Sequence, residues 1–170
     1  PTDVLIGDRS RQEPLPHTYV HRGGDPKECI DVVILAEGYT ADEMDTFMED
    51  AKITATEILS YEPFKSYSAK FNFIAVESIS KDTNVSVPQA KAWRETAVGS
   101  NFMTFYMERY LTSGNVYAMY DLATNIPCEH LIILANTDTY GGGGIYNSYT
   151  LTTAHHPSFR PVVVHEFGHS

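Results

Sequence analysis

The chain has 170 residues, 42% of them hydrophobic, which is enough for one domain with a proper core and short for two. Its 22 acidic and 12 basic residues give a formal net charge of −10. Such a surface repels phosphate backbones and anionic lipids, which argues against nucleic-acid binding and membrane-surface binding. No apolar run is long enough to cross a bilayer, so no transmembrane segment is expected.

The first 28 residues differ in composition from the rest. Residues 1–28 contain four prolines and a glycine pair at positions 23 and 24 among polar residues. This pattern predicts a linker or an N-terminal arm, with a short extended piece at residues 18–20. A folded domain is expected over residues 29–170.

The first half of that domain has the pattern of a strand, a helix and a second strand. Residues 29–36 form a near-continuous apolar run, typical of a parallel central strand covered on both faces. Thr40 and Glu43 have capping-box spacing, which predicts a helix from there to about residue 60. Residues 71–79 alternate in part, which favours a second strand nearer an edge of the sheet.

The second half continues the same alternation of elements. Residues 102–111 carry methionine and tyrosine at helical spacing and predict a second helix that packs into the core. A shorter helix is expected at residues 116–122, and a third buried strand at 129–136. The sequence therefore predicts an α/β fold with a mixed, mostly parallel sheet and flanking helices.

Two cysteines fit no metal-ligand spacing. Cys29 and Cys128 each precede by seven residues an alanine that closes an apolar strand, Ala36 and Ala135. If these strands are neighbours in that register, the two sulfur atoms come close together. A disulfide and two adjacent reduced thiols both remain open.

Four consecutive glycines occupy positions 141–144. Glycine costs backbone entropy on folding, so such a run indicates a place where another group approaches the backbone closely or where φ is positive. Residues 145–153 then read as an extended edge strand, along which a peptide could lie as an added strand. The candidate substrate-binding residues are Gly142, Gly143, Gly144, Ile145 and Tyr146. The alternative is a flexible surface turn.

The strongest chemical signal lies at residues 165–169, which read His-Glu-Phe-Gly-His. On a helix, positions i and i+4 lie one above the other, so His165 and His169 can direct two imidazoles at one metal ion. Glu166 is rotated by about 100°, which suits a base acting on metal-activated water better than a third ligand. Ser158 as N-cap and Pro161 in the first turn are typical of the start of such a helix. The alternative is a pair of surface histidines beside a solvated glutamate.

Five side chains outside this motif are also candidates for functional groups. His155 and His156 are candidate metal ligands, against the alternative that they cap or stabilise a loop. Glu37 follows the first strand, where parallel sheets place functional groups, but a solvent-facing turn is favoured there. Tyr146 and Tyr149 are candidates for stabilising the oxyanion formed during hydrolysis, and a tyrosine or histidine beyond residue 170 is an equal candidate.

Several segments together resemble a known family. Residues 96–102, 108–111, 140–147 and 165–170 resemble the bacterial IgA-peptidase family of zinc metallopeptidases, and the resemblance extends over about residues 28–170. It implies a zincin-like sheet with an antiparallel edge strand, an active-site helix at the C-terminal end, and a secreted or cell-surface bacterial protein. His165 and His169 would bind Zn²⁺, and Glu166 would be the general base.

The resemblance also implies parts that the sequence does not contain. Family members would continue past Ser170 to a further, acidic zinc ligand, and often carry a β-sandwich domain before the catalytic domain. We therefore expect residues 29–170 to be an incomplete catalytic domain, truncated after the His-Glu-x-x-His helix and inactive alone for lack of the third ligand.

The predicted function is zinc-dependent hydrolysis of peptide bonds in a protein or peptide substrate. Two alternatives remain open: a proteolytically inactive zincin-fold module for binding or adhesion, and a metal-dependent amidase acting on small substrates. The sequence does not specify the substrate, the cleavage preference or the oligomeric state.

Overall fold

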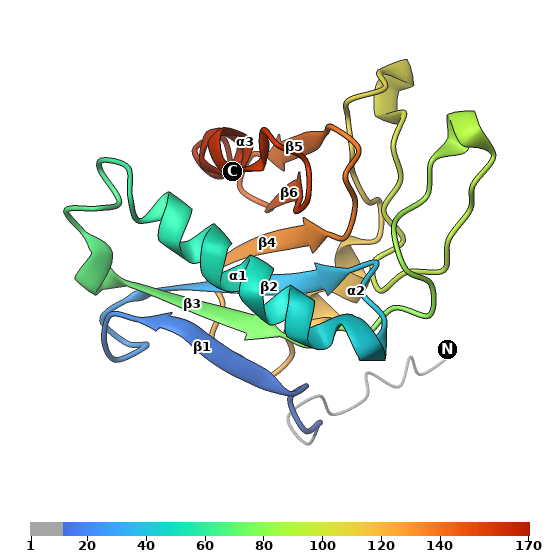
Figure 1. Ribbon diagram of the computed structural model, residues 1–170. Coiled ribbons are helices and arrows are strands. Elements are labelled where there is room, and N and C mark those ends of the chain that lie inside the picture. Colours follow the sequence, from blue (N-terminus) through green and yellow to red (C-terminus); the bar gives the residue numbers. More distant parts are fainter. Residues whose placement is uncertain (1–11) are drawn as a thin grey trace, which may run out of the picture.

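A computed structural model describes residues 12–170, which build one six-stranded sheet with helices on both faces (Figure 1). The strands lie in the order β1-β3-β2-β4-β6-β5. Their bounds are β1 His17–Arg22, β2 Ile30–Glu37, β3 Phe71–Val76, β4 His130–Ala135, β5 Gly142–Ile145 and β6 Tyr149–Thr153. The α-helices are α1 Met44–Ile58, α2 Val116–Leu122 and α3 Phe159–Phe167. Short 3-10 helices occupy Ala41–Glu43, Ser68–Lys70, Pro88–Ala90 and Thr104–Tyr106.

The centre of the sheet is parallel and both of its edges are antiparallel. β2 pairs in parallel with β3 and with β4, and β4 pairs in parallel with β6. β1 is antiparallel to β3, and β5 is antiparallel to β6. The predicted mixed, mostly parallel sheet is confirmed, and β2 is its buried central strand because its apolar run is covered on both faces.

Two hydrophobic cores lie on opposite faces of the sheet. On one face, α1 and α3 cover alternate residues of β2, β3 and β4, including Ile34, Phe73 and Ile132. On the other face, α2 and the loops before it cover the intervening residues, including Leu35 and Ile133. No helix among residues 12–170 is long and apolar enough to cross a membrane.

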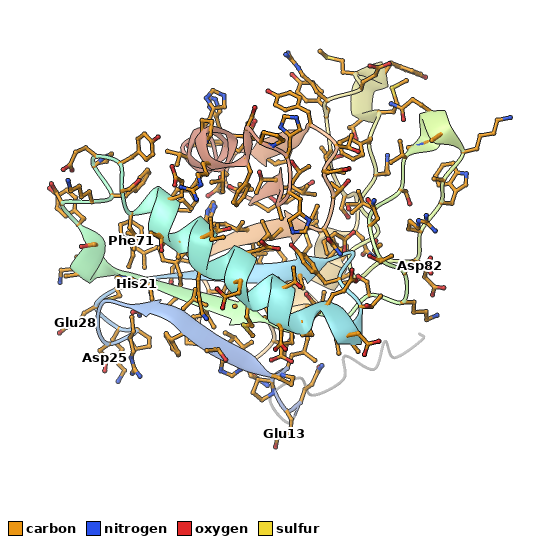
Figure 2. All side chains as sticks on the ribbon, in the orientation of Figure 1. Glu13, His21, Asp25, Glu28, Phe71 and Asp82 are labelled. Atoms are coloured by element: carbon orange, nitrogen blue, oxygen red, sulfur yellow. The ribbon has the colours of Figure 1, made fainter. Side chains whose placement is uncertain are left out.

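The acidic surface and the start of α1 agree with the sequence prediction. Glu13, Asp25 and Glu28 lie at the periphery and are exposed (Figure 2). The Thr40 N–H donates to the Glu43 carboxylate at 2.8 Å, which closes the predicted capping box. The 3-10 turn that follows leads into α1, so the predicted helix is confirmed.

The predicted N-terminal arm contains a strand of the sheet. The extended piece expected at residues 18–20 is β1, which pairs with β3 from the His17–Val76 pair to the Arg22–Asn72 pair. The sheet therefore begins before the predicted boundary at residue 29. Pro14, Pro16 and Pro26 flank β1 and do not interrupt it, which is compatible with an edge strand. The part of the predicted arm before residue 12 lies outside the described residues.

The helix predicted at residues 102–111 does not form. Met103 and Tyr106 have positive φ angles of 68° and 61°, which end any helical run, and only the 3-10 turn Thr104–Tyr106 is present. The main chain of Asn101 instead pairs with that of Thr112, at 3.0 and 3.2 Å. Tyr106 is 93% exposed, so the predicted core stripe is also wrong there.

A second correction concerns residues 145–153, expected as one extended strand. They form the end of β5, a turn and β6, so the chain reverses after Ile145. The edge strand is the glycine tract itself, and β6 is buried between β4 and β5.

The two cysteines are free. The structure pairs Glu37 with Ala135, one residue out of step with the predicted alignment of Ala36 with Ala135. A slip of one residue turns side chains to opposite faces of the sheet, so Cys29 and Cys128 do not face each other. Burial raises the pKa of the Cys128 thiol to about 11, which keeps it protonated at neutral pH.

Candidate active site

The last helix, α3, supplies the two histidines of the motif. It begins after Ser158, whose carbonyl accepts the Val162 N–H at 3.2 Å, and ends at Phe167 with Gly168 as C-cap. The N-cap position was predicted correctly, although the Ser158 side chain makes no capping hydrogen bond. His169 lies just past the helix, where its N–H donates to the Glu166 carbonyl at 3.1 Å. This extra turn keeps His169 above His165.

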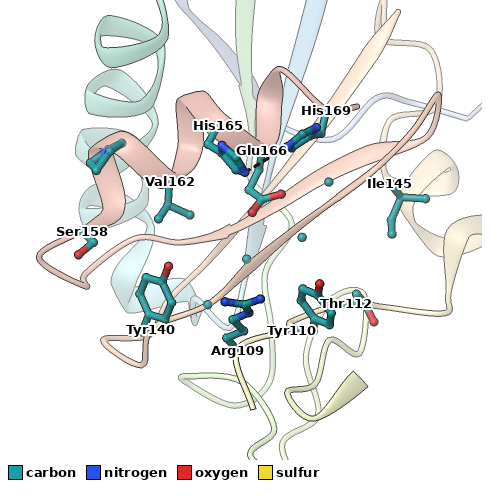
Figure 3. Close-up of a pocket in the computed structure, with 15 residues that line it drawn as sticks. Arg109, Tyr110, Thr112, Tyr140, Ile145, Ser158, Val162, His165, Glu166 and His169 are labelled. Atoms are coloured by element: carbon teal, nitrogen blue, oxygen red, sulfur yellow. Dashed lines mark hydrogen bonds between the residues drawn. The ribbon is translucent and has the colours of Figure 1, made fainter. Parts of the chain in front are cut away.

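The two imidazoles converge on one point (Figure 3). The Nε2 atoms of His165 and His169 are 3.1 Å apart, and their rings are nearly perpendicular at 82°. Two nitrogen ligands at about 2.0–2.1 Å from one tetrahedral zinc ion are roughly 3.3 Å apart. Both side chains are exposed to the cleft described below. This donor pair therefore fits two coordination positions of a zinc ion.

Glu166 lies between the two histidines and points into the same cleft (Figure 3). It is half-buried. Its main-chain carbonyl accepts hydrogen bonds from His169 and Ser170. Among residues 12–170, by contrast, no hydrogen bond or ion pair engages its carboxylate. The carboxylate is therefore available to accept a proton.

A cleft of about 880 Å³ is lined by α3, by β5 and by the loop at residues 109–112. Half of its lining comes from the predicted site: Gly142, Gly143, Gly144, Ile145, His165, Glu166 and His169. The remaining lining residues are Arg109, Tyr110, Thr112, Tyr140, Gly141, Ser158, Pro161 and Val162. Its volume is within the range of ligand-binding clefts, so it can admit a segment of peptide beside the histidines.

The glycines of β5 are needed because α3 packs directly on them. A Cβ atom on Gly144 would lie 2.8 Å from the Glu166 carbonyl oxygen and 3.0 Å from the His169 Cβ. One on Gly142 would lie 3.2 Å from the Val162 Cγ1. The prediction that this tract serves a close approach to the backbone is confirmed.

The outer edge of β5 offers unused backbone groups. The Gly142 N–H points away from β6 and donates to the Arg109 carbonyl at 3.2 Å. Because strand residues alternate, the N–H and C=O of Gly144 face the same edge. No main-chain partner from residues 12–170 bonds them there.

Tyr146 and Tyr149 lie away from the cleft lining. Tyr146 is in the turn after β5 and is 86% exposed. Tyr149 is buried in β6, where its hydroxyl donates to the Ser113 carbonyl at 2.8 Å and accepts the Ser113 N–H at 3.2 Å. The Tyr149 hydroxyl thus stabilises the loop that contains Ser113. Neither of the two tyrosines considered for oxyanion stabilisation faces the histidine pair.

Behind the end of α3, three polar side chains form a small cluster. The Ser170 hydroxyl forms hydrogen bonds with the Thr150 hydroxyl and with the His130 Nε2, the latter at 3.2 Å. It also donates to the Glu166 carbonyl at 3.1 Å. Burial lowers the pKa of His130 to about 4, so its imidazole is neutral at pH 7. The cluster fixes the turn that carries His169.

His155 and His156 do not join the pair. His155 bonds the Asp50 carboxylate at 2.8 Å, and that carboxylate also accepts the Tyr39 hydroxyl at 2.7 Å. His156 accepts the Ser158 N–H at 3.0 Å through its Nδ1. Within residues 12–170, no three His, Cys, Asp or Glu side chains gather as a metal site. The predicted third ligand after Ser170 stays a prediction.

Glu37 is buried, whereas the sequence favoured a solvent-facing turn. Its carboxylate accepts four hydrogen bonds: from the hydroxyls of Thr96 and Ser100, both at 2.6 Å, and from the N–H groups of Val98 and Ser100, at 2.9 and 2.8 Å. The side chain is 0% exposed. Glu37 therefore anchors the loop at residues 96–100 to the end of β2.

Comparison with known proteins agrees with this architecture. No curated protein matches the chain. The family model described as IgA Peptidase M64 matches residues 19–170, which include β2 to β6 and all of α3. The mixed sheet is consistent with a zincin-like domain, and the family is one of metallopeptidases. The chain belongs to the IgA peptidase M64 family.

Proposed function

We propose that this chain carries the catalytic centre of a zinc-dependent endopeptidase in which His165 and His169 bind the metal and Glu166 is the general base. The observation that carries the proposal is the convergence of the two Nε2 atoms, 3.1 Å apart, beside a carboxylate with no other partner among residues 12–170. Imidazole nitrogens are preferred zinc ligands, and the spacing suits one ion.

The chemistry divides between the metal and Glu166. A zinc ion held by the two histidines would supply Lewis acidity, which polarises a peptide carbonyl and lowers the pKa of a bound water toward about 7. The Glu166 carboxylate takes a proton from the attacking water and returns it to the departing amine nitrogen. Its position in the same cleft as the histidines supports this role.

The edge of β5 supports a peptide as the substrate class. An extended peptide can add to a free strand edge through main-chain hydrogen bonds, and Gly144 offers an N–H and a C=O at that edge. Because Gly142 and Gly144 have no side chains, α3 packs directly on β5, and this brings Glu166 close to the strand that would pair with the peptide. Gly142, Gly143, Gly144 and Ile145 are the residues that we propose to bind the peptide, with Tyr146 in the turn beyond them.

The test is hydrolysis of casein by the full-length protein before and after removal of metal. We expect dialysis against a chelator to abolish cleavage and one equivalent of zinc to restore it, with Glu166→Gln inactive throughout. Cleavage that survives chelation, or an active Glu166→Gln variant, would contradict the proposal.

The same assay separates the two alternatives. Zinc binding without cleavage of casein or of any small amide would favour a binding or adhesion module. Turnover of small amides with casein untouched would favour an amidase. The volume of the cleft and the unused edge of β5 lead us to expect casein cleavage.

A further inference from the structure

The cleft contains one cationic side chain. Of its fifteen lining residues only Arg109 is a lysine or arginine, in a chain with 22 acidic and 12 basic residues. It lies on the wall opposite α3, and its guanidinium points across the cleft toward the strand and Glu166 (Figure 3). Besides the zinc ion proposed above, Arg109 is therefore a fixed positive charge that acts on a ligand bound in this cleft.

The main chain of Arg109 is held in place by a hydrogen bond, whereas its guanidinium is accessible in the cleft. Its carbonyl accepts the Gly142 N–H at 3.2 Å, which ties its main chain to β5. The guanidinium carbon lies 5.6 Å from the centre of the Tyr110 ring, within the range of a cation–π contact. The side chain is exposed. Both contacts hold the guanidinium at the cleft, and its N–H groups make no hydrogen bond or ion pair with residues 12–170.

Among residues 12–170, no carboxylate forms an ion pair with this guanidinium. In the described part of the chain, the ion pairs of arginine and lysine are Lys52 with Glu49, Lys81 with Glu95 and Arg160 with Glu57. Glu108 is adjacent in sequence, but it lines a second hollow of about 400 Å³ that shares Arg109 and Tyr140 with the cleft. Arg109 thus lines both hollows, and its charge is not paired with a carboxylate among residues 12–170.

We propose that Arg109 binds a carboxylate of the peptide substrate and makes the cleft selective for peptides that present one beside the scissile bond. A guanidinium can donate two parallel hydrogen bonds to a carboxylate, which adds directional selectivity to charge attraction. The carboxylate has two sources, an Asp or Glu side chain or the C-terminus of the peptide. This inference rests on the proposed peptidase function.

The first test measures binding, so that it does not depend on turnover. The full-length Glu166→Gln protein is titrated with fluorescent peptide pools that are identical except for Glu or Gln at one position, all with amidated C-termini. A further Gln pool with free C-termini separates the two sources. We expect one carboxylate-bearing pool to bind about tenfold more tightly than the amidated Gln pool, and Arg109→Ala to remove that difference.

The second test measures kcat/KM for the same pools with Glu166 intact. Arg109→Ala should lower kcat/KM about tenfold for the preferred pool and leave that for the amidated Gln pool nearly unchanged, and Arg109→Glu should reverse the preference. Arg109→Lys should keep part of it. Arg94→Ala is the matched control, because Arg94 is an exposed arginine that lines neither hollow.

The outcomes are distinct. Equal binding of all pools, or an equal loss on all pools in Arg109→Ala, overturns the inference, since the second result would make Arg109 a general catalytic or structural residue. Failure to cleave any pool overturns the proposed function, while the binding preference still decides the role of Arg109.

Discussion

Two glutamates, Glu37 and Glu166, have very different surroundings and serve different purposes. Glu37, at the end of β2, is 0% exposed and accepts four hydrogen bonds from the loop at residues 96–100. Glu166, on α3, faces an open cleft and has no donor among residues 12–170 for its carboxylate. The Glu37 carboxylate thus has hydrogen-bond donors on both of its oxygens, whereas the Glu166 carboxylate has none from residues 12–170.

The difference teaches where reactivity resides. A carboxylate surrounded by hydrogen-bond donors stabilises the loop that supplies them. Removing its negative charge would weaken these hydrogen bonds or leave some of the donors unpaired. A carboxylate that faces an open cleft beside the two histidines proposed to bind zinc can exchange a proton without disturbing the fold. The same substitution, Glu to Gln, should therefore affect activity at one place and stability at the other.

The largest expected effect is that of Glu166→Gln on turnover. Loss of the general base should lower kcat by about 10³-fold, since positioned acid–base groups contribute roughly 10² to 10⁴. The thermal unfolding midpoint should stay within about 1 °C of wild type, because no hydrogen bond of residues 12–170 depends on this carboxylate. Peptide hydrolysis and calorimetry on one preparation check both halves, and a large fall in the midpoint would break the comparison.

Glu37→Gln should produce the opposite pattern. In the variant, the NH₂ group of the glutamine would face N–H and O–H groups that donate to the carboxylate in the wild type. Because donors would then face donors, the free energy of unfolding should fall by about 3 to 4 kcal/mol. Urea unfolding measures the loss. Activity per folded molecule should stay within about threefold of wild type, and a stability equal to that of wild type would show that the four hydrogen bonds do not hold the loop.

The buried His130 should make stability depend on acid. Its pKa is lowered from 6.5 to about 4 by burial, so the unfolded chain binds a proton more readily than the folded one. Stability is then unaffected above pH 6.5 and falls by about 3 kcal/mol between pH 6.5 and 4. The difference in unfolding free energy between wild type and His130→Asn over this window isolates the effect. Parallel pH curves for the two proteins would rule it out.

The smallest expected effect concerns the contact between β5 and α3. Gly144→Ala would place a Cβ 2.8 Å from the Glu166 carbonyl oxygen, and should lower stability by about 1 to 2 kcal/mol and kcat/KM by about tenfold. Gly114→Ala is the control, because a Cβ there meets no atom within 4 Å. If both variants behave alike, the packing of α3 on β5 does not position Glu166.

The sequence predicted the parts of the fold that depend on local pattern. The apolar runs gave β2 and β4, and the Thr40 and Glu43 pair marked the start of α1. Likewise, residues 116–122 form α2 as expected. These elements are specified by their own residues, either through period and burial or through a cap within four positions.

The failures are places where distant residues decide the local structure. Residues 102–111 have helical spacing, but the Asn101–Thr112 pairing and two positive φ angles impose a loop. The register of β2 on β4 could not be read from alanine positions, since a one-residue slip leaves both strands equally apolar. Glu37 is buried because its donors come from a loop some 60 positions later.

The candidate site divides in the same way. The spacing of His165, Glu166 and His169 is local, and the pair predicted from it converges in space. Arg109 and Tyr140 line the cleft through tertiary contacts, and only the resemblance of residues 108–111 and 140–147 drew attention to their segments. A cleft wall built from separate loops leaves no periodic signal in the sequence.

The measurement that tests the central claim most directly is the zinc content of the full-length protein and its variants after dialysis against a weak chelator. We predict one zinc ion per molecule in wild type and in Glu166→Gln, and less than one tenth of that in His165→Ala and His169→Ala. His156→Ala, a nearby histidine outside the pair, should keep its zinc. Zinc that persists in both His165→Ala and His169→Ala would contradict the account.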